Sequence, residues 1–153
     1  MRDEYDFDED PGTGLAATTG SAAGEGSPGG ADMQAVPSLF YGSADEFVRK
    51  HLRFHYRRVV SRPGHGDFHW QAAWWKSEEA ISRLEALWRA WEVARQDPGG
   101  GMSEWWLNHC DRQMHMLLSS SGPFAGSIDE NKAGAPLPYL PPPEGFFAPD
   151  TQA

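Results

Sequence analysis

The chain has 153 residues and a net charge of -9, and 39% of its residues are hydrophobic, so it has the size of a single domain. The charge is uneven, because residues 1–36 carry eight acidic residues and one basic residue, whereas residues 37–122 carry ten acidic and eleven basic residues. The near-neutral middle argues against strong nucleic-acid binding. No run of about 18 apolar residues is present, which excludes a membrane-spanning helix. Cys110 is the only cysteine, so no intrachain disulfide forms, and without an apolar secretory leader we expect a cytoplasmic protein.

Two segments of low complexity flank this middle part. Residues 1–36 begin with an acidic stretch and continue with Gly, Ala, Ser and Thr, so they offer too little apolar mass to offset the entropy of ordering the chain. Residues 128–153 are rich in proline, and PYLP at 138–141 matches the spacing of a polyproline II segment. We therefore expect a disordered acidic tail over 1–36, a helical domain over 37–127 and a flexible Pro-rich tail over 128–153.

The first predicted helix begins at Ser43. Glu46 follows three residues later, which is the pattern of a capping box. The helix is expected to end near Val60, because Arg62 is followed by a Pro-Gly pair. Its apolar face is spaced by one helical turn and holds Val48, Leu52, His55 and Val59.

The second predicted helix begins after Ser77 and ends near Gln96, before the run DPGGG at 97–101. Ser77 is a typical N-cap residue, and the two glutamates that follow it suit the positive end of the helix. Glu85 and Arg89 form an i,i+4 pair on the solvent side. The apolar arc on the other side holds Ala80, Ile81, Leu84, Leu87, Trp88, Trp91 and Ala94.

The third predicted helix runs from Ser103 to Leu118 and has two apolar stripes. At helical spacing, one stripe holds Trp106, Cys110, Met114, Leu117 and Leu118. The other stripe lies about 100° away and holds Trp105, His109 and Met116. Either the helix is sandwiched between two elements, with the segment around residues 68–75 as a cover, or this second stripe is a candidate face for a protein partner.

The residue pattern does not predict catalysis, a cofactor or a metal site. His51 and His55 are spaced by one turn, and His65 and His69 flank Asp67, but zinc requires three or four converging ligands. Cys110 lies on an apolar stripe, where a cysteine is commonly a small core residue. The glycines at 99–101 lack the Gly-Lys-Ser/Thr ending of a phosphate loop. A metal-dependent enzyme remains only as a third alternative.

A basic stripe on the first helix is the best candidate surface. It consists of Arg49, Lys50, Arg53 and Arg57, which are expected to clear the core face. Such a stripe binds phosphates in nucleic-acid-binding proteins. It is also what a solvated helix face looks like, and it is a suitable surface for an acidic partner or for the acidic stretch at residues 3–10.

A set of short motifs resembles an actinobacterial family known as domain of unknown function 4913. The motifs cover about residues 40–127 and are FYGS at 40–43, EFV at 46–48, YRR at 56–58, RLEALWRAWE at 83–92, GMSEWW at 101–106 and GPF at 122–124, together with Trp70, Trp74, Trp75, His109 and Asp111. The resemblance implies a protein encoded on plasmids or integrated mobile elements, with no established activity. It also implies that relatives carry cysteines at two places where this chain has Gln71 and Ser127, so a metal site built from such cysteines would be missing here.

These observations predict an all-α, tryptophan-rich domain of about three helices that acts as a non-enzymatic interaction module for a protein partner. The setting implied by the resemblance is the transfer or maintenance machinery of a mobile element. The alternative is an accessory protein that binds nucleic acid weakly through the basic stripe.

Overall fold

The computed structural model describes residues 38–149, which contain helices and no β-strand, so the expected all-α class is confirmed. The acidic tail expected over residues 1–36 lies outside the described residues. Within them, no helix is both long and apolar enough to cross a bilayer. The first helix comprises α1 (Ala44–Phe47), the π-helical η1 (Val48–Leu52) and α2 (Arg53–His55). The 3-10 turn η2 (Trp74–Lys76) precedes α3 (Glu78–Ala94), and the last helix comprises α4 (Gly101–Glu104), the π-helical η3 (Trp105–Cys110) and α5 (Asp111–Leu118).

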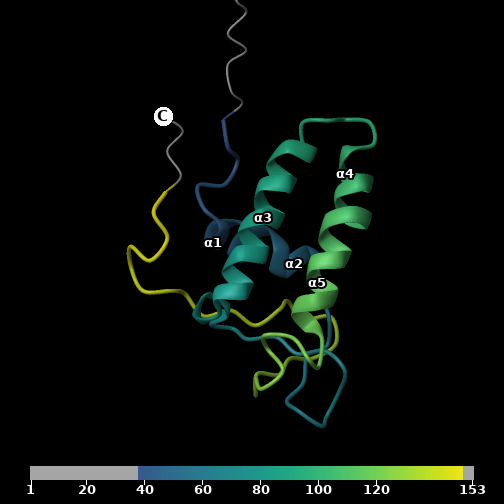
Figure 1. Ribbon diagram of the computed structural model, residues 1–153, viewed down its shortest axis with the longest axis vertical. Helices are drawn as coiled ribbons and strands as arrows, with labels where there is room; N and C mark the ends of the chain where they lie inside the picture. The colour runs from purple at the N-terminus through teal and green to yellow at the C-terminus, as the bar shows by residue number, and fades with distance from the viewer. Residues whose placement is uncertain (1–37, 150–153) are drawn as a thin grey trace, which may run out of the picture. The chain divides into compact units, whose positions relative to one another are not determined.

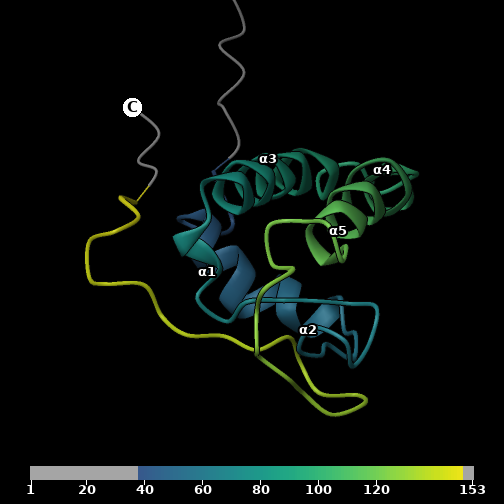
Figure 2. The same cartoon turned by 60° about the horizontal axis from the view of Figure 1, so that its bottom comes forward.

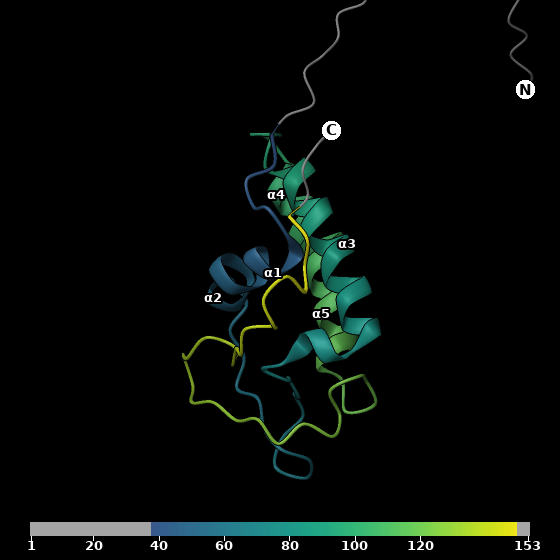
Figure 3. The ribbon, with the colours of Figure 1, turned by 90° about the vertical axis from the view of Figure 1, so that its left-hand side faces the viewer.

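The helix α3 and the helix formed by α4, η3 and α5 run side by side in opposite directions and are joined by a short turn (Figure 1). The helix of α1 and α2 lies on one side of this pair (Figures 2 and 3). Gly101 lets the turn close, because a Cβ at this position would collide with the carbonyl oxygen of Ala94 and crowd the side chain of Asp97. The last turn of α3 and the first turn of α4 therefore meet closely.

Aromatic side chains fill the space between the helices. Trp70, Trp74 and Trp105 have no exposed surface, and Trp88 is only 2% exposed. The expected assignment of Trp88 and Trp91 to the core is confirmed, since both are buried in the same cluster as Leu84 and Leu87. Each buried aromatic ring removes roughly 150–250 Å² from water, which is how a small domain obtains a sufficient core.

The local signals for α3 are confirmed. The hydroxyl of Ser77 accepts a hydrogen bond from the backbone N–H of Ala80, which caps the first turn. Arg89 and Glu85 form the expected surface ion pair at 3.6 Å. The helix therefore begins and ends close to where the sequence predicts.

The first helix departs from its prediction at both ends. Ser43 does cap it by accepting from the N–H of Glu46, but the Glu46 carboxylate accepts from the N–H of Gly42 and not from that of Ser43, so the cap is not reciprocal. The helix ends at His55, and Val59 is 49% exposed. The prediction of a helix to Val60 was wrong because the chain from Tyr56 onward leaves the helical conformation.

The third helix begins at Gly101, without a Ser103 cap, and its middle is π-helical. In an α-helix, residues five apart lie about 140° from each other. A π-helix bonds i to i+5 and fits an extra residue into the turn, so Trp105 and Cys110 share one face and are both fully buried. This extra residue is the reason that Trp105, and not Trp106, became the larger contributor to the core.

The Pro-rich segment is also part of the folded domain. Residues 128–149, here called the strap, belong to the same compact unit as the helices, and Leu137 is completely buried in the core. Figure 2 shows the strap passing close to α2 and the segment that follows it. The flexible tail expected from residue 128 onward is therefore wrong for the described residues of the strap, because its polar backbone and its leucine both find partners in the domain.

Candidate interaction surfaces

The basic stripe divides into two parts with different surroundings. Arg49 lies 3.8 Å from the carboxylate of Asp45, and Lys50 lies 2.9 Å from that of Glu46. Both pairs are i,i+4 contacts on the first helix. Carboxylates one turn away therefore neutralise this half of the stripe.

Arg53 and Arg57 hold the strap through its carbonyl groups. Nε of Arg53 donates to the carbonyl oxygen of Leu137 at 3.0 Å, and Nη1 of Arg57 donates to that of Gly134 at 2.6 Å. Carbonyl oxygens orient these guanidinium groups without cancelling their charge. The sequence placed both arginines clear of the core, whereas the structure gives each a contact with the folded strap.

A cationic and aromatic patch results at the end of α2. The exposed ring of Phe54 lies 4.7 Å from the Arg53 guanidinium and 5.9 Å from that of Arg57, while Arg58 lies 4.1 Å above the ring of Tyr56. We call Arg53, Phe54, Arg57 and Arg58 the cationic patch. Among the described residues, no carboxylate is within ion-pair distance of its three arginines.

The stripe expected as a partner face does not lie on one surface. Trp105 has no exposed surface and donates from Nε1 to the carbonyl oxygen of Leu87 at 3.2 Å. Its ring meets Phe47 edge-on, so the cover is α3 and the first helix, not the segment around residues 68–75. His109 and Met116 are exposed. Of the two alternatives for this stripe, burial between two elements therefore holds for Trp105, and Trp105 is not available as part of a partner face.

Trp105 nevertheless lies beneath a shallow groove between α3 and the start of the third helix. This α3–α4 groove has a volume of about 400 Å³. Small apolar side chains of α3 form one wall, and the start of the third helix forms the other. The groove is lined by Ala90, Val93, Ala94, Asp97, Gly101, Glu104, Trp105 and His109.

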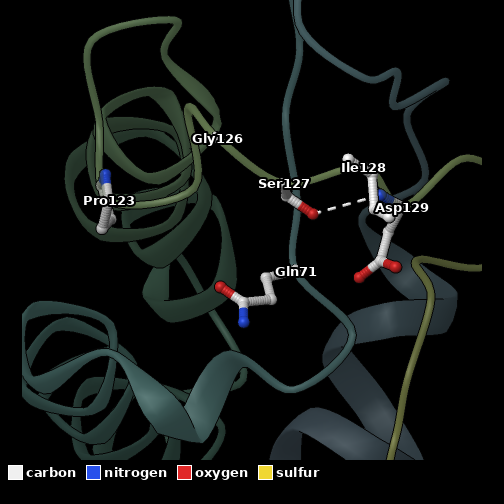
Figure 4. A pocket seen from close by; sticks show the side chains of 6 residues that line it. All are labelled: Gln71, Pro123, Gly126, Ser127, Ile128 and Asp129. Carbon is white, nitrogen blue, oxygen red and sulfur yellow. Dashed lines mark hydrogen bonds between the residues drawn. The ribbon is translucent and has the colours of Figure 1, made fainter.

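A second pocket brings together Gln71 and Ser127, the two positions at which the family resemblance implies cysteines in relatives. The pocket has a volume of about 320 Å³, and Figure 4 shows both side chains around it. Ser127 donates to the carbonyl oxygen of Trp70 at 2.8 Å, and Asp129 accepts from the N–H of Ala72 at 2.7 Å. The hydrogen bonds of Ser127 and Asp129 therefore tie the start of the strap to residues 70–72.

The histidines considered for a metal site have structural contacts. His51 and His55 stack with ring centroids 3.9 Å apart, and burial, followed by the charge of His55, lowers the pKa of His51 to about 4. His69 is buried, and its Nδ1 lies 2.8 Å from the carbonyl oxygen of Ser61. His65 is exposed on the same loop. Within residues 38–149, no three His, Cys, Asp or Glu side chains gather as a metal site would require.

Cys110 is fully buried in the core. Burial, with a smaller contribution from the charge of Asp111, raises the pKa of its thiol to about 12. The neutral thiol is a poor nucleophile, so the structure supports the sequence interpretation of Cys110 as a packing residue.

The comparison with family models agrees with the motifs. The model of a domain of unknown function, DUF4913, matches residues 41–143. The chain belongs to this family. No curated protein and no solved structure matches the chain. The DUF4913 match extends to residue 143 and so includes most of the strap, which agrees with the strap being part of the domain.

The strap is the structural element that sequence reasoning missed in the DUF4913 domain. One signal was present, because the PYLP spacing at 138–141 is typical of a segment that aromatic side chains recognise. Here the recognition is internal: Nε1 of Trp70 donates to the carbonyl oxygen of Pro138 at 2.9 Å, and that of Trp75 donates to Leu140 at 3.1 Å.

Proposed function

We propose that this DUF4913 domain is a non-enzymatic interaction module that binds an acidic segment of a protein partner. The observation that carries the proposal is the cationic patch. It places the guanidinium groups of Arg53 and Arg57 beside the exposed ring of Phe54, while Arg58 lies over the ring of Tyr56. The strap carbonyls hold Arg53 and Arg57 in place without neutralising them. A fixed cluster of uncompensated charge suits an anionic ligand.

The non-enzymatic part of the proposal is supported by how the reactive side chains are used. The one thiol is buried, and its raised pKa keeps it protonated. The buried His69 closes a loop. A role in the transfer or maintenance of actinobacterial plasmids or mobile elements is proposed on the family resemblance alone.

Single-stranded nucleic acid is the second candidate ligand. The observation that favours it is the half-exposed ring of Phe54 between two arginines. Proteins that bind single strands commonly combine a basic surface with an aromatic side chain on which a base stacks. The near-neutral charge of residues 37–122 places this candidate second.

The experiment measures fluorescence anisotropy of two labelled probes, a peptide of Asp, Glu and Phe and a single-stranded oligonucleotide, with the full chain at several salt concentrations. We compare Arg57→Gln/Arg58→Gln with the control Arg49→Gln/Lys50→Gln. Both double variants remove two positive charges, but the control residues already have carboxylate partners.

The proposal expects the peptide to bind more tightly, and the patch variant to weaken its binding by about tenfold while the control changes it by about twofold or less. If the oligonucleotide binds more tightly, the second candidate replaces the first, and the patch variant should lower the salt slope by about 0.7 for each lost phosphate contact. Equal effects of the two variants, or no binding of either probe, would contradict both candidates.

A further inference from the structure

The α3–α4 groove is a second surface of different character from the cationic patch. Trp105 lies beneath the groove with no exposed surface, and its indole N–H is already bonded to Leu87. The apolar surface of the groove is therefore that of its α3 wall. The volume of about 400 Å³ is within the range of roughly 300–1,000 Å³ that ligand pockets occupy.

The α3 wall is apolar and only lightly covered. Val93 is 73% exposed, although it is a β-branched apolar residue. Ala90 and Ala94 are its neighbours in the groove, and their small side chains allow another backbone to approach closely. A partner helix with a large apolar side chain could place it beside Val93.

The charges around the groove have one sign. Asp97 and Glu104 are among the lining residues, and no lysine or arginine is. Asp97 holds the turn by accepting from the N–H of Gly99 at 2.9 Å, so its carboxylate is fixed at the groove. Glu104 is exposed at the start of the third helix. Carboxylates at the edge of an apolar groove favour a ligand with positive side chains around an apolar one.

We propose that the α3–α4 groove binds a basic amphipathic helix of a protein partner, in the helix-in-groove mode. An apolar side chain of the partner packs against Ala90, Val93 and Ala94, and its lysines or arginines pair with Asp97 and Glu104. The domain then has two surfaces of opposite preference, with the cationic patch for an acidic segment and this groove for a basic one.

The test uses the full chain and two labelled peptide probes. Each probe has about 14 residues, which is long enough to place leucines on successive turns of one helix face. One is a leucine–lysine peptide with leucines at i, i+3, i+4 and i+7, and the other replaces each lysine with glutamate. The informative variants are Val93→Arg and Leu107→Arg. Both replace an exposed apolar residue with arginine, since Leu107 is 63% exposed, but only Val93 lines the groove.

We expect the leucine–lysine peptide to bind and the leucine–glutamate peptide not to bind. Val93→Arg should weaken the binding by about tenfold or more, and Leu107→Arg by about twofold or less. Glu104→Gln should weaken it several-fold and reduce its salt dependence. Equal effects of Val93→Arg and Leu107→Arg would overturn the proposal, because they would show attraction to overall negative charge. Tighter binding of the leucine–glutamate peptide would also overturn it.

Discussion

The indole N–H of Trp70 donates a hydrogen bond to the carbonyl oxygen of Pro138 at 2.9 Å, although the two residues are 68 positions apart. A polyproline II segment leaves its carbonyl groups without internal partners, so they are available to an indole donor. Here the chain recognises its own Pro-rich segment, and this contact makes the strap a structural part of the domain. Substitutions of strap residues that contact the domain should therefore lower the free energy of unfolding of the domain.

Leu137 should anchor the strap. Leu137→Ala removes a completely buried side chain, and we expect it to lower the free energy of unfolding by about 2–4 kcal/mol. Leu140→Ala is the matched control, because Leu140 is 56% exposed in the same strap and should cost about 0.5 kcal/mol or less. Urea denaturation followed by circular dichroism measures both. Equal stability of the Leu137 variant and the native chain would mean that the strap does not contribute to the fold.

Trp105 should be a core residue. Trp105→Ala removes a fully buried ring together with its hydrogen bond to Leu87, and we expect a loss of about 3–5 kcal/mol in stability. Leu107→Ala, two residues further along and exposed, should change stability little. Thermal unfolding of the two variants compares them directly. A Trp105→Ala protein as stable as the native one would favour the exposed partner face over burial.

Glu92 should make stability depend on pH. Its buried carboxylate accepts hydrogen bonds from the backbone N–H groups of Phe40 and Tyr41 and from the side chains of Trp88 and Arg95. Burial by itself would raise the pKa of Glu92, but these donors outweigh it and hold the pKa below its ordinary value. A lowered pKa in the folded state means that the stabilisation is present at neutral pH and is lost as the pH falls through the folded-state value.

Glu92→Gln should therefore cost about 2–3 kcal/mol at neutral pH and should leave a weaker decline of stability under acidic conditions. The control is Glu85→Gln, a change on the solvent side of α3. Urea unfolding at a series of pH values from neutral to acidic tests this. A pH profile of the Glu92 variant that parallels that of the native chain would assign the acid sensitivity to other carboxylates.

Cys110 should resist modification in the folded protein. Its burial and its raised pKa, about 12, leave little thiolate to react. We expect a thiol-reactive chromophore to label the native chain only very slowly and the urea-unfolded chain rapidly and completely. Rapid labelling without denaturant would show that the third helix opens or that the thiol is accessible.

The sequence by itself determined the elements whose signals are local. Ser77 and the residues after it specify the start of α3, because a hydroxyl cap and the first turn involve only neighbouring residues. The periodicity of this helix likewise predicted the burial of Leu84, Trp88 and Trp91. The apolar stripe that contains Cys110 likewise predicted that this residue is buried in the core.

Only the tertiary structure decided the features that depend on distant residues. The π-helical turn that carries Trp105 into the core leaves no signal at regular α-helical spacing, so the sequence left open whether this side chain is buried or exposed. The first helix stops early, and Asn131 in the strap bonds the extended chain that follows through the N–H of Val60 and the carbonyl oxygen of Arg58. A Pro-rich segment has no periodic apolar face, and its burial therefore depended on indole and guanidinium donors that folding brings to its carbonyl groups.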